Sequence, residues 1–326
     1  MTPVLLSGEA WTLALIFAAL LVGTAIRGMA RLRSRDEHAR EHFASLLTWW
    51  VLATLLAAAI LLGALGVCIL LAAASVIGFR EYARLAAMRP ADRLAARAVL
   101  AGIPLLYLAI LLGAGARAIA VLPVVALVLV VTAQLSRAQT AGYVRSTGGL
   151  LFGVLTVVYG LAHGALLATL PAAVEVPASD AAGSAALRIA ADGGAGWFLY
   201  LVVLTQANDI AQALVGRRLG SRRITPRISP HKTWEGFIGG GVVTVLVALG
   251  LAPWLTPLDP LRAAFAGVVV FGAGFLGDIN MSAVKRDAGV KDSSALLPGM
   301  GGMLDRVDSL TFTAPALYWL IAAPPW

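Results

Sequence analysis

One segment of the chain, residues 277–309, gathers side chains that together could bind phosphate groups and a metal ion. It lies between two apolar runs, although only 13% of the chain is charged. Its charged residues are Asp278, Lys285, Arg286, Asp287, Lys291, Asp292, Asp305, Arg306 and Asp308. Carboxylates supply oxygen ligands for a divalent metal, and Lys and Arg hold phosphate oxygens, so the segment predicts phosphoryl or nucleotidyl transfer.

The alternative for this segment is a salt-bridge network that only closes a helix bundle, and Lys285, Arg286 and Asp287 fit that alternative best. Charged groups are costly near lipid, however, and are usually retained there for a function. Asp305 and Asp308 are three residues apart, so on a helix they would share one face. We therefore interpret the segment as the active site.

The composition indicates a polytopic membrane protein. The 326 residues are 60% hydrophobic, with a mean hydropathy of +0.86 and 25 Lys and Arg against 17 Asp and Glu. Several apolar runs reach the ~20 residues that span a bilayer, which excludes an ordinary soluble domain. The single cysteine, Cys68, rules out an internal disulfide. Only Glu9 precedes the first apolar run, which predicts a membrane helix and not a cleaved signal.

The apolar runs predict an all-α transmembrane bundle of about ten helices. The runs fall near 10–26, 44–63, 66–79, 98–113, 118–134, 149–170, 193–213, 236–252, 261–277 and 309–323. Breaks at Gly63 and Gly66 separate the second helix from the third. We divide the chain into an N-terminal region, 1–192, with about six helices, and a catalytic region, 193–326.

The basic residues predict the orientation in the cell (inner) membrane. If the 27–43 loop is cytoplasmic and the helices alternate, the other inside segments are 80–97, 135–148, 214–235 and 278–308. Only three of the 25 Lys and Arg then lie outside, namely Arg117, Arg188 and Arg262. This asymmetry follows the positive-inside rule and predicts an active-site cavity that faces the cytoplasm.

The N-terminal loops carry less specific signals. The basic loops 27–43 and 80–97 are typical of contacts with anionic lipid, and we expect no nucleic-acid partner. Glu81 lies close to a membrane end, and we rank it below the acidic residues of 277–309 as a candidate for the site. His38 and His42 lack a nearby third metal ligand, so we expect them to be solvated. The segment 171–192 is predicted to be a solvated connector.

Two further stretches are richer in polar groups than their positions require. Thr205, Gln206, Asn208, Asp209 and Gln212 follow one another near the end of an apolar helix, where they must line a cavity or satisfy one another. Asp209 is the strongest functional candidate among them. The basic loop that follows contains Pro226 and Pro230, which prevent a continuous helix, and the sequence SPHKTWEG at 229–236. That sequence is a candidate for gripping phosphates or a nucleobase.

The part of the chain from about residue 200 to residue 308 resembles the phosphatidate cytidylyltransferases, also called CDP-diacylglycerol synthases. The signature of that family combines a Ser, a Lys-Arg pair, a Lys-Asp pair, a Pro-Gly-His-Gly-Gly turn and a final Leu-Asp-Arg-x-Asp. The chain meets it with Ser282, Lys285, Arg286, Lys291, Asp292, Pro298, Gly299, Gly301, Gly302, Asp305, Arg306 and Asp308. SPHKTWEG resembles a second landmark, and Asp209 followed by Gly216-Arg217 resembles a third.

Three departures from the family pattern stand out. Met300 replaces the His of the glycine-rich turn, and a thioether neither donates a hydrogen bond nor carries charge. His231 replaces the first Lys of the second landmark. Around Asp209, the family's small hydroxyl, Ala and Tyr positions hold Ile210, Gln212 and Ala213. The departures suggest a divergent branch, with a different lipid phosphate as one alternative.

The resemblance implies that the protein joins CTP and phosphatidate to form CDP-diacylglycerol and diphosphate. This reaction is a step of phospholipid biosynthesis. The implied ligands of Mg²⁺ are Asp278, Asp305 and Asp308, and K⁺ is implied as a second cation. The implied catalytic residues are Lys285, Arg286, Lys291, Asp292 and Arg306. The implied substrate-binding residues are Asp209, Arg217, Ser229, Lys232, Thr233, Trp234, Glu235, Ser282, Gly301 and Gly302. A homodimer is implied as well.

Two other classes compete with this interpretation. A transporter or flippase would suit ten helices with buried charges, but the sequence shows no inverted repeat and its charges gather at one end. A degenerate family member that acts as a scaffold would explain Met300. Release of pyrophosphate from CTP, tested with several lipid phosphates, separates these classes.

Overall fold

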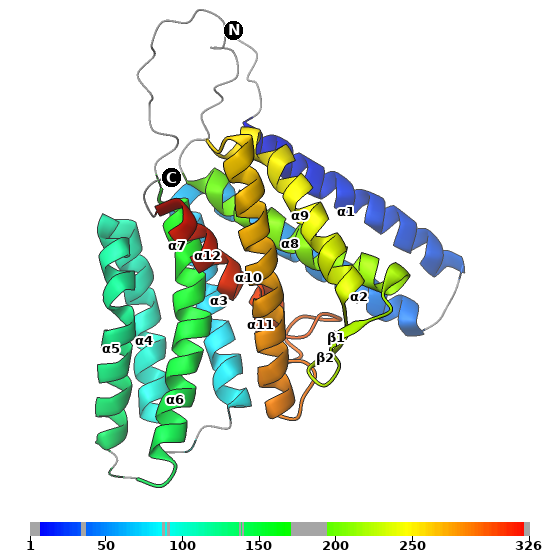
Figure 1. The fold of residues 1–326 in the computed structure, drawn as a ribbon. Coiled ribbons are helices and arrows are strands. Elements are labelled where there is room, and N and C mark those ends of the chain that lie inside the picture. The colour runs from blue at the N-terminus through cyan, green and yellow to red at the C-terminus, as the bar shows by residue number, and fades with distance from the viewer. Residues whose placement is uncertain are drawn as a thin grey trace, which may run out of the picture.

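The computed structural model describes residues 7–33, 37–86, 89, 92–136, 138, 140–170 and 194–322. The described chain is almost entirely helical, and most of its helices lie side by side in one bundle (Figure 1). The N-terminal helices are α1 (Gly8–Arg33), α2 (Glu37–Leu61), α3 (Gly63–Leu85), α4 (Arg93–Ala109), α5 (Gly115–Leu135), α6 (Tyr143–Gly153) and α7 (Gly160–Ala168). The C-terminal helices are α8 (Ala195–Leu219), α9 (Trp234–Leu255), α10 (Pro260–Asp287), α11 (Leu304–Val307) and α12 (Leu310–Ala322).

Seven helical stretches in the described part of the chain are long and apolar enough to cross a membrane. One of them, Arg93–Leu135, contains two helices, α4 and α5. They are separated by a kink at Gly113, whose φ of 77° lets the chain fold back. The apolar stretch Ser45–Leu61 is shorter, and α12 has 13 residues, fewer than the ~20 that span a bilayer. The protein is therefore a multi-pass membrane bundle, and the predicted total of about ten crossings stays a prediction.

Each predicted helical range falls on a helix of the structure, but some helices are longer than predicted. α10 continues to Asp287, beyond the predicted end at residue 277. The added turns carry Asp278 and Lys285, whose side chains form ion pairs with Lys232 on the hairpin and Asp305 on α11, and Ser282, which bonds to Asp278 within α10. A helix can extend through charged residues when they face protein partners instead of lipid. The predicted connector 171–192 and the side chains of His38 and His42 lie outside the described residues.

One element corrects the all-α prediction. A short antiparallel hairpin, β1 (Arg223–Thr225) and β2 (Ser229–Thr233), connects α8 to α9. Pro226 lies in its turn and Pro230 lies in β2, so the prediction that these prolines prevent a helix is confirmed. A sheet of two strands has only edge strands, where a missing backbone N–H is tolerated.

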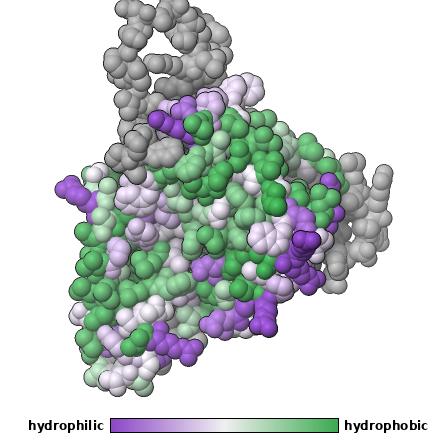
Figure 2. Space-filling model, viewed as in Figure 1, coloured by the Kyte–Doolittle hydropathy of each residue, from purple (hydrophilic) through white to green (hydrophobic). Residues whose placement is uncertain are grey.

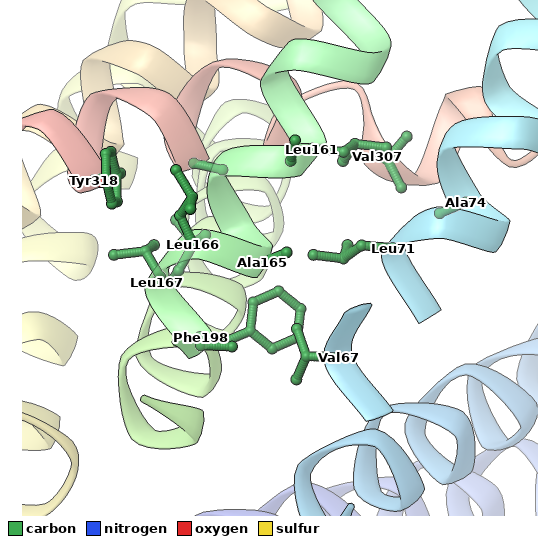
Figure 3. Close-up of a cluster of buried hydrophobic side chains, with 14 of the residues drawn as sticks. Val67, Leu71, Ala74, Leu161, Ala165, Leu166, Leu167, Phe198, Val307 and Tyr318 are labelled. Carbon is green, nitrogen blue, oxygen red and sulfur yellow. The ribbon is translucent and has the colours of Figure 1, made fainter. Parts of the chain in front are cut away.

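The hydrophobic core joins the N-terminal and C-terminal helices. Val67 on α3 lies beside Phe198 on α8, and Leu71 on α3 lies beside Ala165 on α7, with Tyr318 on α12 at the opposite side of α7 (Figure 3). All five side chains are buried. Helices from both predicted regions therefore pack around one core.

Small residues let several helices approach closely, as in other membrane bundles. Gly236 and Gly240 on α9 face Gln212 on α8, where a Cβ at either glycine would collide with that residue. Gly160 on α7 lies against the backbone of Thr311 on α12. These contacts bring the polar residues of α8 within reach of the hairpin and α10.

The polar surface gathers at one end of the molecule. Hydrophilic residues lie along the lower edge, below a broad apolar surface (Figure 2). The hairpin, the end of α10 and the loop 288–303 lie toward the same end, as do the C-terminal ends of α3 and α5 (Figure 1). Described residues from four of the five segments that the basic residues assigned to one side of the membrane thus lie toward this end, and the side of the membrane that it faces stays a prediction.

A matched pair of Gly→Ala substitutions tests the close packing. We expect Gly160→Ala to destabilise the protein by about 1–3 kcal/mol, because the added methyl group overpacks the contact with Thr311. Gly250→Ala on α9 adds the same methyl group in open space and should leave stability unchanged or raise it slightly. Thermal unfolding of the purified protein in detergent measures both. Equal melting temperatures for the two variants would contradict the packing.

Candidate active site

A chain of hydrogen bonds joins the polar stretch of α8 to the hairpin and to α10. Asn208 Oδ1 accepts from Gln212 Nε2 at 2.9 Å and from Thr244 Oγ1 at 3.3 Å. Gln212 Oε1 in turn accepts from Lys232 Nζ at 2.9 Å. Lys232 Nζ forms an ion pair with Asp278 Oδ2 at 2.6 Å. Asn208 and Gln212 of α8 therefore bond to each other, and Gln212 also holds a lysine at the site.

Local sequence explains how this lysine is placed. Thr233 ends β2, and its Oγ1 accepts from the amide of Gly236 at 3.1 Å, which caps the start of α9. Lys232 is thereby fixed between the hairpin and the first turn of α9. On α10, Ser282 Oγ donates to Asp278 Oδ1 at 3.3 Å from one turn away. Each partner of the ion pair is thus supported by its own element.

A second arrangement surrounds Asp305 on α11. Its Oδ1 accepts from Lys285 Nζ at 2.7 Å, and its Oδ2 accepts from the backbone N and the Oγ of Ser293, each at 2.8 Å, and from the amide of Gly302 at 2.9 Å. Burial would raise the pKa of Asp305, but these hydrogen bonds and the charge of Lys285 outweigh it and lower the pKa below its ordinary value. The arrangement therefore stabilises the fold at neutral pH, and that contribution is lost as the pH falls through this lowered pKa.

Three carboxylates form the negative centre of the site, and these are Asp209, Asp278 and Asp308. Burial raises the pKa of Asp308, and the charges of Asp278 and Asp209 raise it further. Asp308 Oδ1 accepts from the neighbouring amide of Ser309 at 2.8 Å. Asp209 Oδ1 is buried and has no hydrogen-bond partner among the described residues. Carboxylates that oppose one another in this way favour the binding of a cation.

Three basic side chains act electrostatically on these carboxylates. Lys232 and Arg306 act on Asp209, and Lys285 acts on Asp308. Arg306 Nε is buried and has no hydrogen-bond partner in the described part of the chain. A guanidinium with an unused donor is suited to a phosphate oxygen.

The structure places the predicted metal residues in two separate surroundings. Asp278 and Asp308 interact with Asp209, whereas both oxygens of Asp305 are bonded to Lys285, Ser293 and Gly302. Within the described ranges, no three Asp, Glu, His or Cys side chains are already arranged to hold a metal ion. Asp209, which we assigned to substrate binding, thus joins the carboxylates that Asp305 was expected to join.

A cavity of about 410 Å³ opens between the end of α8 and the hairpin. Its size is in the range of small-molecule sites. The lining includes Arg217, Arg223, Ser229, His231, Lys232 and Thr233. Three cationic residues in one cavity are suited to a polyanion, so the predicted residues Arg217, Ser229, Lys232 and Thr233 share a plausible phosphate or nucleotide site.

Three predicted catalytic residues lie at the surface. The guanidinium of Arg286 donates to the carbonyl oxygens of Val290, at 3.0 Å, and Ile228, at 3.4 Å, and so ties the loop to the hairpin. Lys291 and Asp292 are exposed. No hydrogen bond or ion pair joins these three side chains to Asp209, Asp278 or Asp308 in the described part of the chain, so their catalytic roles stay predictions.

The remaining predicted residues shape the backbone of the site. Glu235 accepts from the Oγ of Ser221 at 2.5 Å and from the amides of Ser221 and Arg222, which fixes the start of the hairpin. A Cβ on Gly301, whose φ is 82°, would lie 2.7 Å from Asp305 Oδ2. The amide of Gly302 donates to Asp305 and is not free for a phosphate. Trp234 is exposed and packs edge-on against Phe237.

One residue that received little weight from sequence occupies a central position. The carboxylate of Glu81 accepts from Ser293, Ser294, Met303 and Leu304, all within the signature segment. The only sequence signal was an acidic residue at a membrane end within a basic loop. Burial of Glu81, which is 3% exposed, is the property that the sequence did not reveal.

Fold and site together define an integral membrane protein with a carboxylate-rich site next to a cavity lined by Arg217, Arg223 and Lys232. The model of the cytidylyltransferase family matches residues 42–323. The chain belongs to the cytidylyltransferase family.

Individual relatives fall into two groups. An Escherichia coli (strain K12) protein called "Uncharacterized protein YnbB" is 34% identical over 95% of this chain and 97% of its own length. The phosphatidate cytidylyltransferase of Mycobacterium bovis is 35% identical over 48% of this chain and 51% of its own. That of Bacillus subtilis (strain 168) is 40% identical over 40% of this chain and 48% of its own. The likeness to these two enzymes therefore covers about half of each chain.

A double-mutant cycle tests the pair of Lys285 and Asp305. The two side chains are 12% and 4% exposed, so Lys285→Met leaves a buried carboxylate without its cation. We expect this variant to lose about 3 kcal/mol of stability, and we expect the double variant with Asp305→Asn to recover part of that loss. Thermal unfolding at neutral pH measures the cycle. If the two single effects simply add, the two residues do not interact.

Proposed function

We propose that the protein transfers the cytidylyl group of CTP to a lipid phosphate, with phosphatidate as the first candidate, in phospholipid biosynthesis. The products would be CDP-diacylglycerol and diphosphate. The observation that carries this proposal is the cluster of Asp209, Asp278 and Asp308 with Lys232, Lys285 and Arg306. Membership of the cytidylyltransferase family supports a CTP-dependent transferase. The named phosphatidate enzymes among the relatives support the choice of lipid.

The chemistry requires two polyanions to meet. An oxygen of the lipid phosphate attacks the α-phosphorus of CTP, and the bond from that phosphorus to the bridging oxygen breaks, so that pyrophosphate leaves. Alignment and neutralisation of charge are the main demands on such a site. Lys285 and Arg306 would hold phosphate oxygens, and Lys232 with Arg217 and Arg223 would hold the triphosphate in the hairpin cavity. A general base is hardly needed, because the lipid phosphate is already ionised at neutral pH.

The carboxylates fit a divalent cation by their chemistry. Asp209, Asp278 and Asp308 offer oxygen ligands, which Mg²⁺ prefers, and the buried Oδ1 of Asp209 has no hydrogen-bond partner among the described residues. Bound there, Mg²⁺ would neutralise phosphate oxygens, and K⁺ is a candidate for a second cation. Asp278 is paired with Lys232, which is free to transfer its hydrogen bond from that carboxylate to a substrate phosphate. In this proposal Asp305 is the ion-pair partner that positions Lys285 and is not a metal ligand.

A second candidate is a cytidylyltransferase for another lipid phosphate. Met300 stands where the family signature has His, and its side chain is buried, 8% exposed, within the signature loop. The relative that matches along nearly the whole chain has no stated activity. The replacement at Met300 is the observation that supports a divergent substrate as the alternative to phosphatidate. A catalytically inactive scaffold is the third candidate and rests on Met300 alone.

The proposed site faces the cytoplasm, where CTP is available. The charged end of the molecule carries the hairpin and the loop 288–303, and the distribution of basic residues assigns these segments to the inside. Membrane lipids would surround the apolar surface and deliver the lipid phosphate. A homodimer is part of the proposal by family resemblance.

A pyrophosphate-release assay on the purified protein tests the function. With CTP, Mg²⁺ and phosphatidate we expect release, and we expect Asp278→Asn to lower kcat by about 100-fold or more, because one carboxylate of the centre is lost. Asp305→Asn should also abolish activity while the protein still inserts normally in the membrane. Asp259→Asn, a helix-capping residue at the other end of α10, is the matched control and should retain full activity.

The lipid in this assay is varied to separate the candidates. Release with a different lipid phosphate but not with phosphatidate identifies the second candidate. Binding of CTP without release for any lipid identifies the scaffold. If the protein neither binds CTP nor releases pyrophosphate with any lipid, it is not a CTP-dependent transferase.

The substitution Met300→His tests the divergent position. The histidine of the family signature would act by binding the nucleotide or by transferring a proton. In either case we expect the variant to turn over phosphatidate faster, because imidazole can donate a hydrogen bond where a thioether cannot. Rates with phosphatidate and with other lipid phosphates are compared for both proteins. An unchanged preference would show that residue 300 does not set the substrate.

A further inference from the structure

Glu81, near the end of α3, makes four hydrogen bonds to a segment more than 200 residues away. Its Oε1 accepts from Ser294 Oγ at 2.7 Å and from the amide of Met303 at 3.1 Å. Its Oε2 accepts from Ser293 Oγ at 3.0 Å and from the amide of Leu304 at 2.8 Å. One carboxylate thus holds both ends of the glycine-rich turn.

The contacts continue from Glu81 to the proposed phosphate-binding lysine. Ser293 Oγ lies 3.0 Å from Glu81 Oε2 and 2.8 Å from Asp305 Oδ2. The other oxygen of Asp305 binds Lys285 Nζ at 2.7 Å. The position of Glu81 is therefore transmitted through one hydroxyl group and one carboxylate to Lys285.

The backbone of the turn is shaped around this carboxylate. A Cβ on Gly302 would collide with Ser293 Oγ and would lie within 2.7 Å of both oxygens of Glu81. No residue larger than glycine fits there while the four hydrogen bonds are kept. The close approach of backbone and carboxylate is thus a fixed part of the loop.

The stability of the fold alone does not explain why an acidic residue occupies position 81. Glu81 is 3% exposed, and among the described residues it forms no ion pair. A buried carboxylate without a counter-charge costs more free energy than a neutral side chain of similar shape. Its two oxygens accept from two backbone amides and from the hydroxyl of Ser294, and they share the single hydroxyl hydrogen of Ser293 with Asp305. A neutral amide would offer only one oxygen to these donors.

We propose that Glu81 is a positioning residue that fixes the turn 293–304 and, through Ser293 and Asp305, the ammonium group of Lys285. The N-terminal helices would then contribute directly to the geometry of the site. The consequence for substrate binding rests on the proposed function, since it takes Lys285 to hold a substrate phosphate. The consequence for the loop itself does not.

The test is Glu81→Gln in the full-length protein, with Asp259→Asn as the matched control. The amide keeps the shape of the side chain, but its NH₂ group opposes two donors of the loop. We expect hydrogen exchange of the backbone amides at 302–304 to accelerate about tenfold or more, while exchange in α9 stays unchanged. Asp259→Asn removes an acidic helix cap at the other end of α10 and should leave the loop unaffected.

Kinetics separate a positioning role from a general loss of folded protein. Misplacement of Lys285 should raise the KM for CTP or for the lipid phosphate about tenfold, whereas a smaller folded fraction lowers only the apparent kcat. If Glu81→Gln does not fold, Ser294→Ala removes a single donor from the same carboxylate and should give a smaller change in the same direction.

Each outcome decides one of the two proposals. Wild-type protein without transferase activity defeats the proposed function, and accelerated exchange at 302–304 in Glu81→Gln would still support the positioning role. Exchange that matches wild type in both Glu81→Gln and Ser294→Ala overturns that role. Faster exchange with an unchanged KM for both substrates would show that the loop is held by Glu81 but that Lys285 does not depend on it.

Discussion

Mutual repulsion of carboxylates inside an apolar bundle is the constraint on which this structure depends. Asp209 comes from α8, Asp278 from α10 and Asp308 from the turn between α11 and α12, and each would be unfavourable in lipid. Lys232, Lys285 and Arg306 reduce the repulsion, and every one of these cations reaches the centre from a different element. The hairpin, the long end of α10 and α11 are therefore needed at one place. A bundle built only from apolar helices would require none of them.

The packing of small residues makes this convergence possible. Gly236 and Gly240 allow α9 to lie against Gln212, and Gly277 allows α10 to approach the backbone at Asp308. Without these close contacts, Lys232 would not reach both Gln212 and Asp278. The glycines that give a membrane bundle its tight packing thus also set the distances within its polar centre.

The sequence predicted the helices and most of the charged centre, because apolar run length and dense charge are local properties. Asp278, Asp308 and Lys285 were identified in this way. Asp305 was assigned to the metal by resemblance to the family signature, and its contacts with Lys285, Ser293 and Gly302 place it in different surroundings from Asp278 and Asp308. The hairpin was missed because its strands are three and five residues long, too short for a periodic pattern. Long-range contacts such as that of Glu81 leave no local signal.

The predicted division between an N-terminal helical region, 1–192, and a catalytic region, 193–326, is crossed by contacts at the signature loop. Glu81 on α3 binds the signature loop, and Thr48 Oγ1 on α2 donates to the carbonyl of Pro298 at 3.0 Å. The glycine-rich turn that carries Met300 is therefore held from both sides by N-terminal helices. Since a turn of this kind owes its shape to the groups around it, a change in α2 or α3 can alter the site as directly as a change in the signature itself.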